Sequence, residues 1–393
     1  MTTTSSGFAA AGFEPVAEVF EGHFRDGLEA GAACAVYHRG QLVVDLQAGL
    51  ADARTGRPWT PDTLTVVFSV TKGLLAICGY LACQRGLLDF DAPVTSVWPE
   101  FGANGKERTT VRDLFSHRAG LIALDTDLTL ADLAAWTPVI TAIEEQKPLW
   151  QPGTEFSYHP LTFGWLTGEV LRRVTGLPPG ELIREWLSRP LAAEAWIGLP
   201  ASEEPRVAWL RGPQTTGDPA LARHLEQMLS VPAAVRSMSL GAALPPTMVD
   251  GSGTDFNAPA VHQIQIPAAN GITTATALAR IYAATVSRID GTPALFTDAS
   301  IADATTVRSA GTQWPAVPAH PGIRFSTGFL INGIPARPLL SDSSFGHDGA
   351  SGALAYADAA TETGFAYVTS QFGALDDQRA NNLTRALRQC LGR

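Results

Sequence analysis

Strand-like segments at both ends of the chain, separated by a long helical middle, most strongly limit what this sequence can fold into. Residues 33–38 and 41–48 have the pattern of two strands joined by a tight turn at Arg39 and Gly40. Three further strand-like segments lie near the C-terminus, at 324–331, 351–358 and 364–370. This order predicts an α/β domain made from both termini and an inserted helical domain.

The helical segments set the expected domain limits. We expect the α/β domain to comprise residues 1–120 and 270–393, and the mainly helical domain to comprise residues 121–269. The expected helices cover residues 13–28, 70–84, 110–117, 130–136, 161–174, 180–187, 219–229, 273–289 and 376–391. Residues 232–267 are rich in Pro, Gly, Ala and Ser and are too long for an ordinary connection. We therefore expect a long loop there, lying over an active site.

The composition excludes several classes of protein. With 45% hydrophobic residues over 393 positions, the chain can bury a large core and is not disordered. The formal charge is -10 and no run or stripe of Lys and Arg occurs, which argues against a nucleic-acid partner. No apolar stretch approaches the length of about eighteen residues that a membrane helix needs, and residues 1–7 lack the features of a signal peptide. We expect no membrane partner.

The cysteines and histidines give no sign of a metal centre. The four cysteines, which have no metal-ligand spacing, are Cys34, Cys78, Cys83 and Cys390. Cys78 and Cys83 fall on different faces of an expected helix, so a disulfide between them is not expected. Free thiols are typical of a reducing compartment, with the cytoplasm as the default. Because no His-Glu-x-x-His motif occurs either, we expect no metal and no cofactor.

Ser69 and Lys72 stand one helical turn apart in the apolar segment 68–75, in a chain that has only three lysines. Residues three apart on a helix share one face, so the serine hydroxyl and the lysine amine can share a hydrogen bond. This is the geometry of an activated nucleophile, provided that burial lowers the pKa of Lys72 enough to keep its amine neutral near pH 7. The alternative is a serine at a helix start and a lysine that reaches solvent. The motif alone does not decide between them.

Two later segments carry further candidate groups. A turn at Pro152 and Gly153 brings Tyr158 to the start of an expected helix, where a tyrosine is most often a core or rim aromatic. Residues 345–352 form a Gly-rich turn with a strand after it, which lets a ligand approach the backbone closely. A plain hairpin turn and a structural His347 explain that second segment equally well.

Three motifs in this order resemble those of the serine hydrolases related to class C β-lactamases and D,D-peptidases. They are Ser-Val-Thr-Lys at 69–72, Pro-Gly-Thr-x-Phe-x-Tyr at 152–158 and His-Asp-Gly-Ala-Ser-Gly at 347–352. Within that superfamily the chain is most similar to the family VIII carboxylesterases. The resemblance spans most of the chain and implies a β-lactamase and penicillin-binding-protein-like fold. In that fold an antiparallel sheet is flanked by helices and a helical domain is inserted.

The resemblance also implies catalytic roles. Ser69 would be the nucleophile that forms an acyl-enzyme, and Lys72 would accept or shuttle its proton. Tyr158 would act as the general base or as the proton donor to the leaving alkoxide, and the resemblance leaves open whether Lys72 or Tyr158 is the primary base. The backbone N–H groups of Ser69 and Ala350 would form the oxyanion hole.

Departures from the superfamily pattern bear on the substrate. His347 and Gly349 would line the substrate pocket, but His347 stands where the lactamases have the lysine of Lys-Thr-Gly. Pro160 stands where they have the asparagine of Tyr-x-Asn. A mostly neutral imidazole therefore replaces the cation that meets a drug's carboxylate. These changes favour a serine carboxylesterase acting on neutral esters of small to medium acyl chains.

Several alternatives stay open at this point. β-Lactamase or D,D-peptidase activity, and acyl transfer from the same acyl-enzyme, would use the same residues; a catalytically silent sensor domain is a further alternative. An α/β-hydrolase is disfavoured because no serine has the Gly-x-Ser-x-Gly frame. Nothing in the sequence positions a Ser-His-Asp triad on His117 or His347. The expected partner is a small-molecule ester, and the sequence assigns no oligomeric state, natural substrate or enantiopreference.

Overall fold

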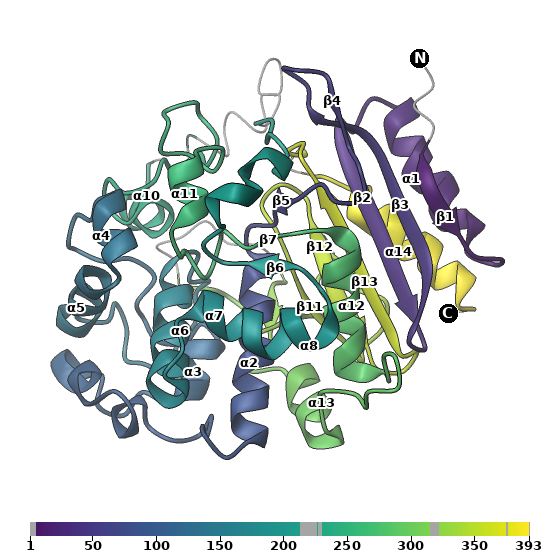
Figure 1. The fold of residues 1–393 in the computed structure, drawn as a ribbon. Helices are drawn as coiled ribbons and strands as arrows, with labels where there is room; N and C mark the ends of the chain where they lie inside the picture. Colours follow the sequence, from purple (N-terminus) through teal and green to yellow (C-terminus); the bar gives the residue numbers. More distant parts are fainter. Residues whose placement is uncertain (1–4, 213–225, 227–229, 315–321, 375, 393) are drawn as a thin grey trace.

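One sheet, whose strands come from both ends of the chain, forms the framework of the molecule (Figure 1). This computed structural model describes residues 5–212, 226, 230–314, 322–374 and 376–392. In that part of the chain, ten strands follow the order β1-β3-β2-β13-β12-β11-β10-β9-β8, with β4 beside β3, and each pairs antiparallel with its neighbours. Their bounds are β1 (Ser6–Ala9), β2 (Gly31–His38), β3 (Gln41–Asp52), β4 (Arg57–Pro58), β8 (Ser309–Ala310), β9 (Arg324–Phe325), β10 (Leu330–Ile331), β11 (Ser344–Asp348), β12 (Leu354–Asp358) and β13 (Thr363–Thr369). The predicted antiparallel sheet is confirmed.

The hairpin of β2 and β3 forms where the sequence allows its turn. Arg39 and Gly40 have φ values of 49° and 76°, and two successive positive φ values match the twist of the strands that they join. Successive side chains of a strand point to opposite faces of the sheet. In β2 they enter two separate hydrophobic cores, Ala32, Cys34 and Val36 in one, and Ala33, Ala35 and Tyr37 in the other. The sheet is therefore covered on both faces.

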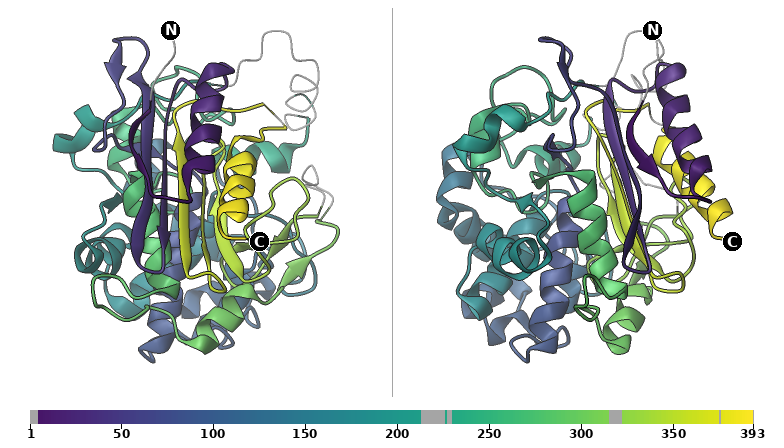
Figure 2. Two further views of the ribbon diagram at one scale, coloured as in Figure 1. Left: turned by 90° about the vertical axis from the view of Figure 1, so that its right-hand side faces the viewer. Right: turned by 45° about the vertical axis from the view of Figure 1, so that its right-hand side comes forward.

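The terminal helices cover one face of the sheet, and an internal helix covers the other (Figure 2). α1 (Glu14–Arg25) and α14 (Arg379–Cys390) pack against each other on the first face. They bury residues spaced four apart, which is typical of one helix face: Val16 and Phe20 from α1, and Leu383 and Leu387 from α14. α12 (Ala275–Val286) lies on the second face, against β2, β12 and β13.

The other helices lie on the same side of the sheet as α12 (Figure 1). They are α2 (Val70–Gln84), η1 (Val94–Ser96), η2 (Pro99–Gly105), α3 (Val111–Phe115), α4 (Leu130–Ala135), α5 (Thr137–Glu145), α6 (Thr162–Thr175), α7 (Pro179–Ile183), η3 (Arg184–Ser188), α8 (Arg189–Leu191), η4 (Ala201–Arg206), α10 (Pro232–Ser239), α11 (Pro259–Gln263) and α13 (Asp298–Thr305). A small antiparallel sheet joins β5 (Thr65–Val66), β7 (Ile272–Thr273) and β6 (Ala195–Trp196).

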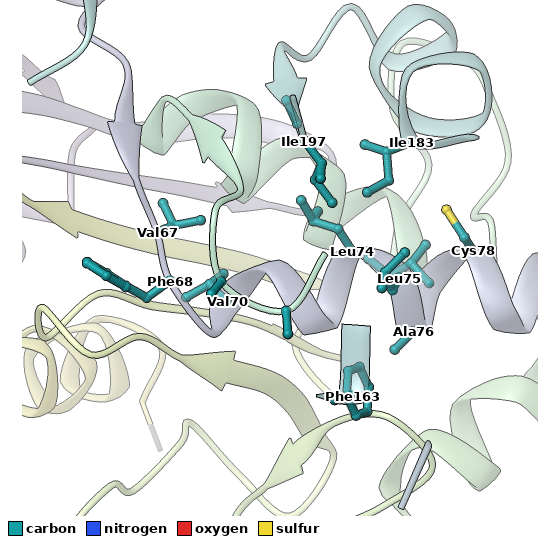
Figure 3. Close-up of a cluster of buried hydrophobic side chains, with 14 of the residues drawn as sticks. Val67, Phe68, Val70, Leu74, Leu75, Ala76, Cys78, Phe163, Ile183 and Ile197 are labelled. Carbon is teal, nitrogen blue, oxygen red and sulfur yellow. The ribbon is translucent and has the colours of Figure 1, made fainter. Parts of the chain in front are cut away.

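α2 runs through the interior between the sheet and the helical layer. Its residues 70–82 are all buried. Leu74 points toward Ile183 and Ile197, which belong to the same hydrophobic core (Figure 3). A helix that is apolar on all sides is typical of a protein interior. The lysine that α2 carries, Lys72, is therefore surrounded by the core instead of reaching solvent.

The structure corrects the expectation for residues 232–267. They do not form one long loop, because α10 begins at Pro232 and α11 at Pro259, and a proline fits the first turn of a helix well. Only residues 240–258 between these two helices lack regular structure. The helix expected at 219–229 lies, apart from residue 226, outside the described residues.

The sequence predicts none of the strands β1, β4, β5, β6, β7, β8 and β11, of which β11 and β1 bear most on the main sheet. β12 follows the Gly-rich turn as predicted, but β11, which precedes that turn and carries His347, has Gly, Ser and Asp among its five residues. Its place in the sheet comes from its pairing with β10 and β12, which no local pattern encodes. β1 similarly lies close to the Thr- and Ser-rich terminus and pairs with β3.

The domain limits at residues 120 and 270 stay a prediction.

Candidate active site

A strained turn presents Ser69 at the start of α2. Phe68 has a φ of 47°, which is a genuine outlier for a bulky residue. Its buried ring packs against Phe256 and Phe372, with ring centroids 5.1 and 5.3 Å away, and these contacts hold the backbone in place. Strain of this kind persists only where surrounding packing enforces it, and it clusters at functional sites. The Thr71 hydroxyl closes the turn by donating a hydrogen bond to the Phe68 carbonyl.

Lys72 is fully buried, and its amine lies within hydrogen-bond distance of three oxygen atoms. Its Nζ lies 3.1 Å from Ser69 Oγ, 2.8 Å from the Pro160 carbonyl oxygen and 2.9 Å from the Ala268 carbonyl oxygen. Burial lowers the pKa of Lys72 well below its usual value, and the charge of Asp348 opposes this only in part. In its neutral form the amine has two N–H groups for the Pro160 and Ala268 carbonyls, and its lone pair can accept the Ser69 hydroxyl proton. Burial thus shifts the pKa of Lys72 in the direction that an amine able to accept the Ser69 proton requires.

Tyr158 completes the contacts of the serine hydroxyl. Its hydroxyl donates a hydrogen bond of 2.7 Å to Ser69 Oγ. Its ring stacks on Phe325 with an interplanar angle of 6°, and Lys72 Nζ lies 4.9 Å from the ring centroid. Burial raises the pKa of Tyr158 above its usual value, so the resting side chain is a neutral phenol. Ser69 thus lies between a neutral phenol and an amine whose pKa is lowered by burial.

The turn after β11 lies next to the segment that leads into Ser69. A Cβ atom at Gly349 would lie 2.3 Å from the Val67 carbonyl oxygen, so only glycine allows this approach. The Gly349 N–H donates to the Ala353 carbonyl at 2.8 Å and closes the turn. Ala350 is exposed at the tip of that turn. The turn therefore brings Ala350 to the side of the site where an oxyanion donor is expected, and its role as that donor stays a prediction.

His347 and Asp348 end β11 beside the same tyrosine. The His347 ring is buried, 6.0 Å from the Tyr158 ring, and its Nδ1 lies 2.8 Å from the Asp348 carbonyl oxygen. The Asp348 carboxylate lies 3.3 Å from Arg337 Nε. Its charge raises the pKa of both Lys72 and Tyr158, so it acts on the site electrostatically. A carboxylate thus stands near the reacting groups.

Several groups at the site could not be assigned from the sequence. The carbonyls of Pro160 and Ala268 come from segments far from Lys72 in sequence, and a backbone acceptor has no sequence signature. The sequence suggests His117 only as a possible triad member, but its Nδ1 accepts a hydrogen bond from the His159 backbone N–H. Its position at the end of the helix expected at 110–117 is the only sequence signal for this role.

The described residues give no indication of a metal site or a membrane span. Across residues 5–212, 226, 230–314, 322–374 and 376–392, no group of three or more His, Cys, Asp or Glu side chains could hold a metal ion. Within the same part of the chain, no helix is both long enough and apolar enough to cross a bilayer. All four cysteines are free, as the sequence predicted.

Comparisons with known proteins agree with this geometry. Residues 20–389 match the family model described as Beta-lactamase. The Esterase/beta-lactamase LipL of Mycobacterium tuberculosis is 35% identical over 373 residues, which cover 92% of this chain and 82% of that protein. A solved family VIII carboxylesterase superposes with a TM-score of 0.85 at 31% identity, over 98% of this chain and 99% of that chain. A penicillin-binding protein homologue from Caulobacter crescentus gives a TM-score of 0.84 at 34% identity, also over 98% and 99%.

Proposed function

Because the chain belongs to the beta-lactamase family of serine hydrolases, we propose that it is a carboxylesterase that uses an acyl-enzyme on Ser69. The observation that carries this proposal is the position of Ser69 Oγ, 3.1 Å from Lys72 Nζ and 2.7 Å from the Tyr158 hydroxyl. The proposed substrates are esters of small to medium acyl chains. The solved family VIII carboxylesterase and LipL, whose name includes esterase, support an ester substrate.

The proposed reaction follows from the protonation states of the site. Ser69 Oγ attacks the ester carbonyl while its proton passes to the neutral amine of Lys72. The Tyr158 phenol donates its proton to the leaving alkoxide, and the proton held by Lys72 then restores the phenol. The backbone N–H groups of Ser69 and Ala350 stabilise the oxyanion. Water attacks the acyl-enzyme by the reverse proton transfers and releases the acid.

The groups around the site favour a neutral substrate. Pro160 offers only its carbonyl, which already accepts a hydrogen bond from Lys72, and therefore cannot bind a lactam amide as an asparagine side chain would. The His347 side chain stands in place of a lysine, so the cation that would bind a substrate carboxylate at this position is missing. Both features support neutral esters over substrates that carry a carboxylate.

A covalent label tests the proposed nucleophile. We expect an activated p-nitrophenyl phosphonate to add one phosphonyl group per protein chain, with p-nitrophenol as the leaving group. Intact mass spectrometry would measure the added mass, and peptide mapping would locate it. A label on Ser69 supports the proposal, whereas a label on another residue, or no label in the folded protein, contradicts it.

The alternative activities use the same acyl-enzyme and differ in their substrates. LipL is named as an esterase and a beta-lactamase, and one solved structure is a penicillin-binding protein homologue, so lactam hydrolysis is the second candidate. We expect fast hydrolysis of short-chain p-nitrophenyl esters and little turnover of nitrocefin; rapid nitrocefin turnover would favour this candidate. Acyl transfer would appear as a new ester when a competing alcohol is present.

Tyr158→Phe should lower kcat for ester hydrolysis by about 10²- to 10⁴-fold, because it removes the proton donor and leaves the ring in place. The measurement is steady-state kinetics on a p-nitrophenyl ester, with circular dichroism to verify the fold. Tyr282→Phe is the matched control: in the described part of the chain the buried Tyr282 hydroxyl has no hydrogen-bond partner, and its loss should leave kcat unchanged. A twofold loss in Tyr158→Phe would remove the proposed role of its hydroxyl.

Asp348→Asn should move the acidic limb of the kcat/KM pH profile to lower pH. The Asp348 charge stabilises the ammonium form of Lys72, so removing that charge lowers the pKa of Lys72 further. If the neutral amine is the active form, the variant should keep its activity to lower pH than the unmodified enzyme. Asp127→Asn, which removes an exposed carboxylate paired with Arg236, is the control. An acidic limb that moves upward or stays in place would argue against Lys72 as the titrating group.

The cellular setting is also a proposal. All four cysteines are free, and Cys34 and Cys78 are buried with the pKa of each thiol raised above its usual value by burial. Free thiols are typical of a reducing compartment. We therefore place the enzyme in the cytoplasm.

A further inference from the structure

We propose that His117 is a positioning residue that holds the segment 157–159 so that the Tyr158 hydroxyl stays in hydrogen-bond contact with Ser69. This inference rests on the proposed role of Tyr158. It begins from two hydrogen bonds that the same residue accepts. The Ser157 N–H donates to the His117 carbonyl at 3.2 Å, and the His159 N–H donates to His117 Nδ1 at 3.1 Å. His117 therefore binds the backbone immediately before and immediately after Tyr158.

The remaining backbone donor of this segment is held from a third place in the chain. The Tyr158 N–H donates to Gln313 Oε1 at 2.9 Å. Three successive N–H groups thus have fixed acceptors, and His117 supplies two of them. Because the backbone at 157–159 cannot rotate without losing these bonds, the direction in which the Tyr158 side chain leaves the backbone is also fixed.

The His117 ring itself contacts the tyrosine. Its centroid lies 5.0 Å from the Tyr158 ring and 4.3 Å from the Phe325 ring, which stacks on Tyr158. It also lies 5.0 Å from Phe163 of α6. These contacts bury the His117 side chain almost completely, at 1% exposure. The imidazole therefore restrains both the backbone and the ring of Tyr158.

The backbone of His117 shows that its side chain is needed. It has a φ of 62° directly after Ser116, which caps the C-terminus of α3. A residue in this left-handed conformation commonly ends a helix, and glycine or asparagine fills that position most easily. Glycine would fit this backbone at lower cost, but it could not accept a hydrogen bond from His159. The presence of histidine is explained if its Nδ1 is required.

The hydrogen bonds also define the protonation state of the ring. Nδ1 accepts an N–H, so the proton of the neutral imidazole must be on Nε2. The titratable groups that face the ring are His159, Lys72, His347 and Tyr158. Burial, followed by the charges of His159, Lys72 and His347, lowers the pKa of His117 well below its usual value. His117 therefore stays neutral and serves as an acceptor, not as a titrating base.

Two substitutions at residue 117 test the need for a side-chain hydrogen-bond acceptor separately from the need for a positive φ. In His117→Asn, Oδ1 takes the position of Nδ1, and asparagine tolerates a positive φ. In His117→Gly the backbone fits, but the acceptor is missing. A displacement of about 1 Å in a catalytic group costs about 10²-fold in rate, so we expect kcat of His117→Gly to fall by about that factor with KM nearly unchanged. His117→Asn should restore most of this loss.

Amide hydrogen exchange gives a readout that does not depend on activity. Exchange at His159 should be faster in His117→Gly than in the unmodified protein, and slow again in His117→Asn, whereas Ser157 keeps the backbone carbonyl of residue 117 as its acceptor in both variants. The pH profile of either variant should keep its shape, because His117 does not titrate in the working range. His23→Asn, in α1, is the control for loss of a buried histidine and should leave kcat unchanged.

The outcomes separate this inference from the proposed function. If the unmodified protein hydrolyses esters and His117→Gly is equally active, or if His117→Asn is as impaired as His117→Gly, the positioning role is overturned. Unchanged exchange at His159 in His117→Gly would also overturn it. If the unmodified protein neither hydrolyses esters nor takes a phosphonate on Ser69, the proposed function fails, and the exchange data alone decide whether His117 holds the segment.

Discussion

Ser69→Ala should abolish ester hydrolysis, with a loss of roughly 10⁶-fold in kcat, because no acyl-enzyme can form without the hydroxyl. The fold should survive. Lys72 would keep its hydrogen bonds to the Pro160 and Ala268 carbonyls, and only two hydrogen bonds to the partly exposed Ser69 hydroxyl would be lost. Each such bond contributes about 1 kcal/mol net to the free energy of unfolding, so the change in stability should be small.

The measurement for Ser69→Ala combines p-nitrophenyl ester kinetics with phosphonate labelling and thermal unfolding. Ser237→Ala is the matched control, since the Ser237 hydroxyl donates only to the Ala234 carbonyl of its own helix. The control should keep full activity and full labelling. Residual turnover near that of the unmodified enzyme in a folded Ser69→Ala protein would show that another group is the nucleophile.

The parts of the fold that the sequence predicts are those with local causes. The hairpin of β2 and β3 follows from Arg39 and Gly40, whose positive φ values suit a two-residue turn. The predicted helix at 70–84 coincides with α2, because a mainly apolar run ends shortly before Gly86, which takes a positive φ. These features depend on residues close together in sequence, so pattern reasoning finds them.

The parts that sequence reasoning misses depend on tertiary contacts. In β11, a Cβ atom at Gly346 would lie 2.1 Å from the Ala355 carbonyl oxygen, so the glycine that makes the segment look like a turn is required by its neighbour β12. The same holds for the site. The identities of Ser69, Lys72 and Tyr158 follow from motif order, but the Pro160 and Ala268 carbonyls that hold Lys72 are brought there by the fold.

Lys72→Met should lower kcat about as much as Ser69→Ala, since removal of a base that activates the nucleophile can cost as much as removal of the nucleophile. Methionine retains most of the side-chain volume and removes the amine. Because Ser69 and Lys72 act as a unit in the proposed mechanism, the double variant should be no slower than Ser69→Ala alone. Effects that multiply in the double variant would mean that the two residues act independently. Kinetics of all three variants on one ester provide this comparison.

The stability of Lys72→Met gives a second, independent test of the neutral lysine. The pKa of Lys72 is lowered well below its ordinary value in the folded protein, so between these two pKa values the unfolded chain binds one more proton than the folded one. In that pH window the amine makes the free energy of unfolding rise with pH, by about 1.4 kcal/mol per unit. Lys72→Met lacks this contribution, so the unmodified protein should gain stability relative to the variant as pH increases through the window. Urea unfolding of both proteins at several pH values measures the difference, and a difference that is independent of pH would mean that Lys72 carries its charge in the folded state.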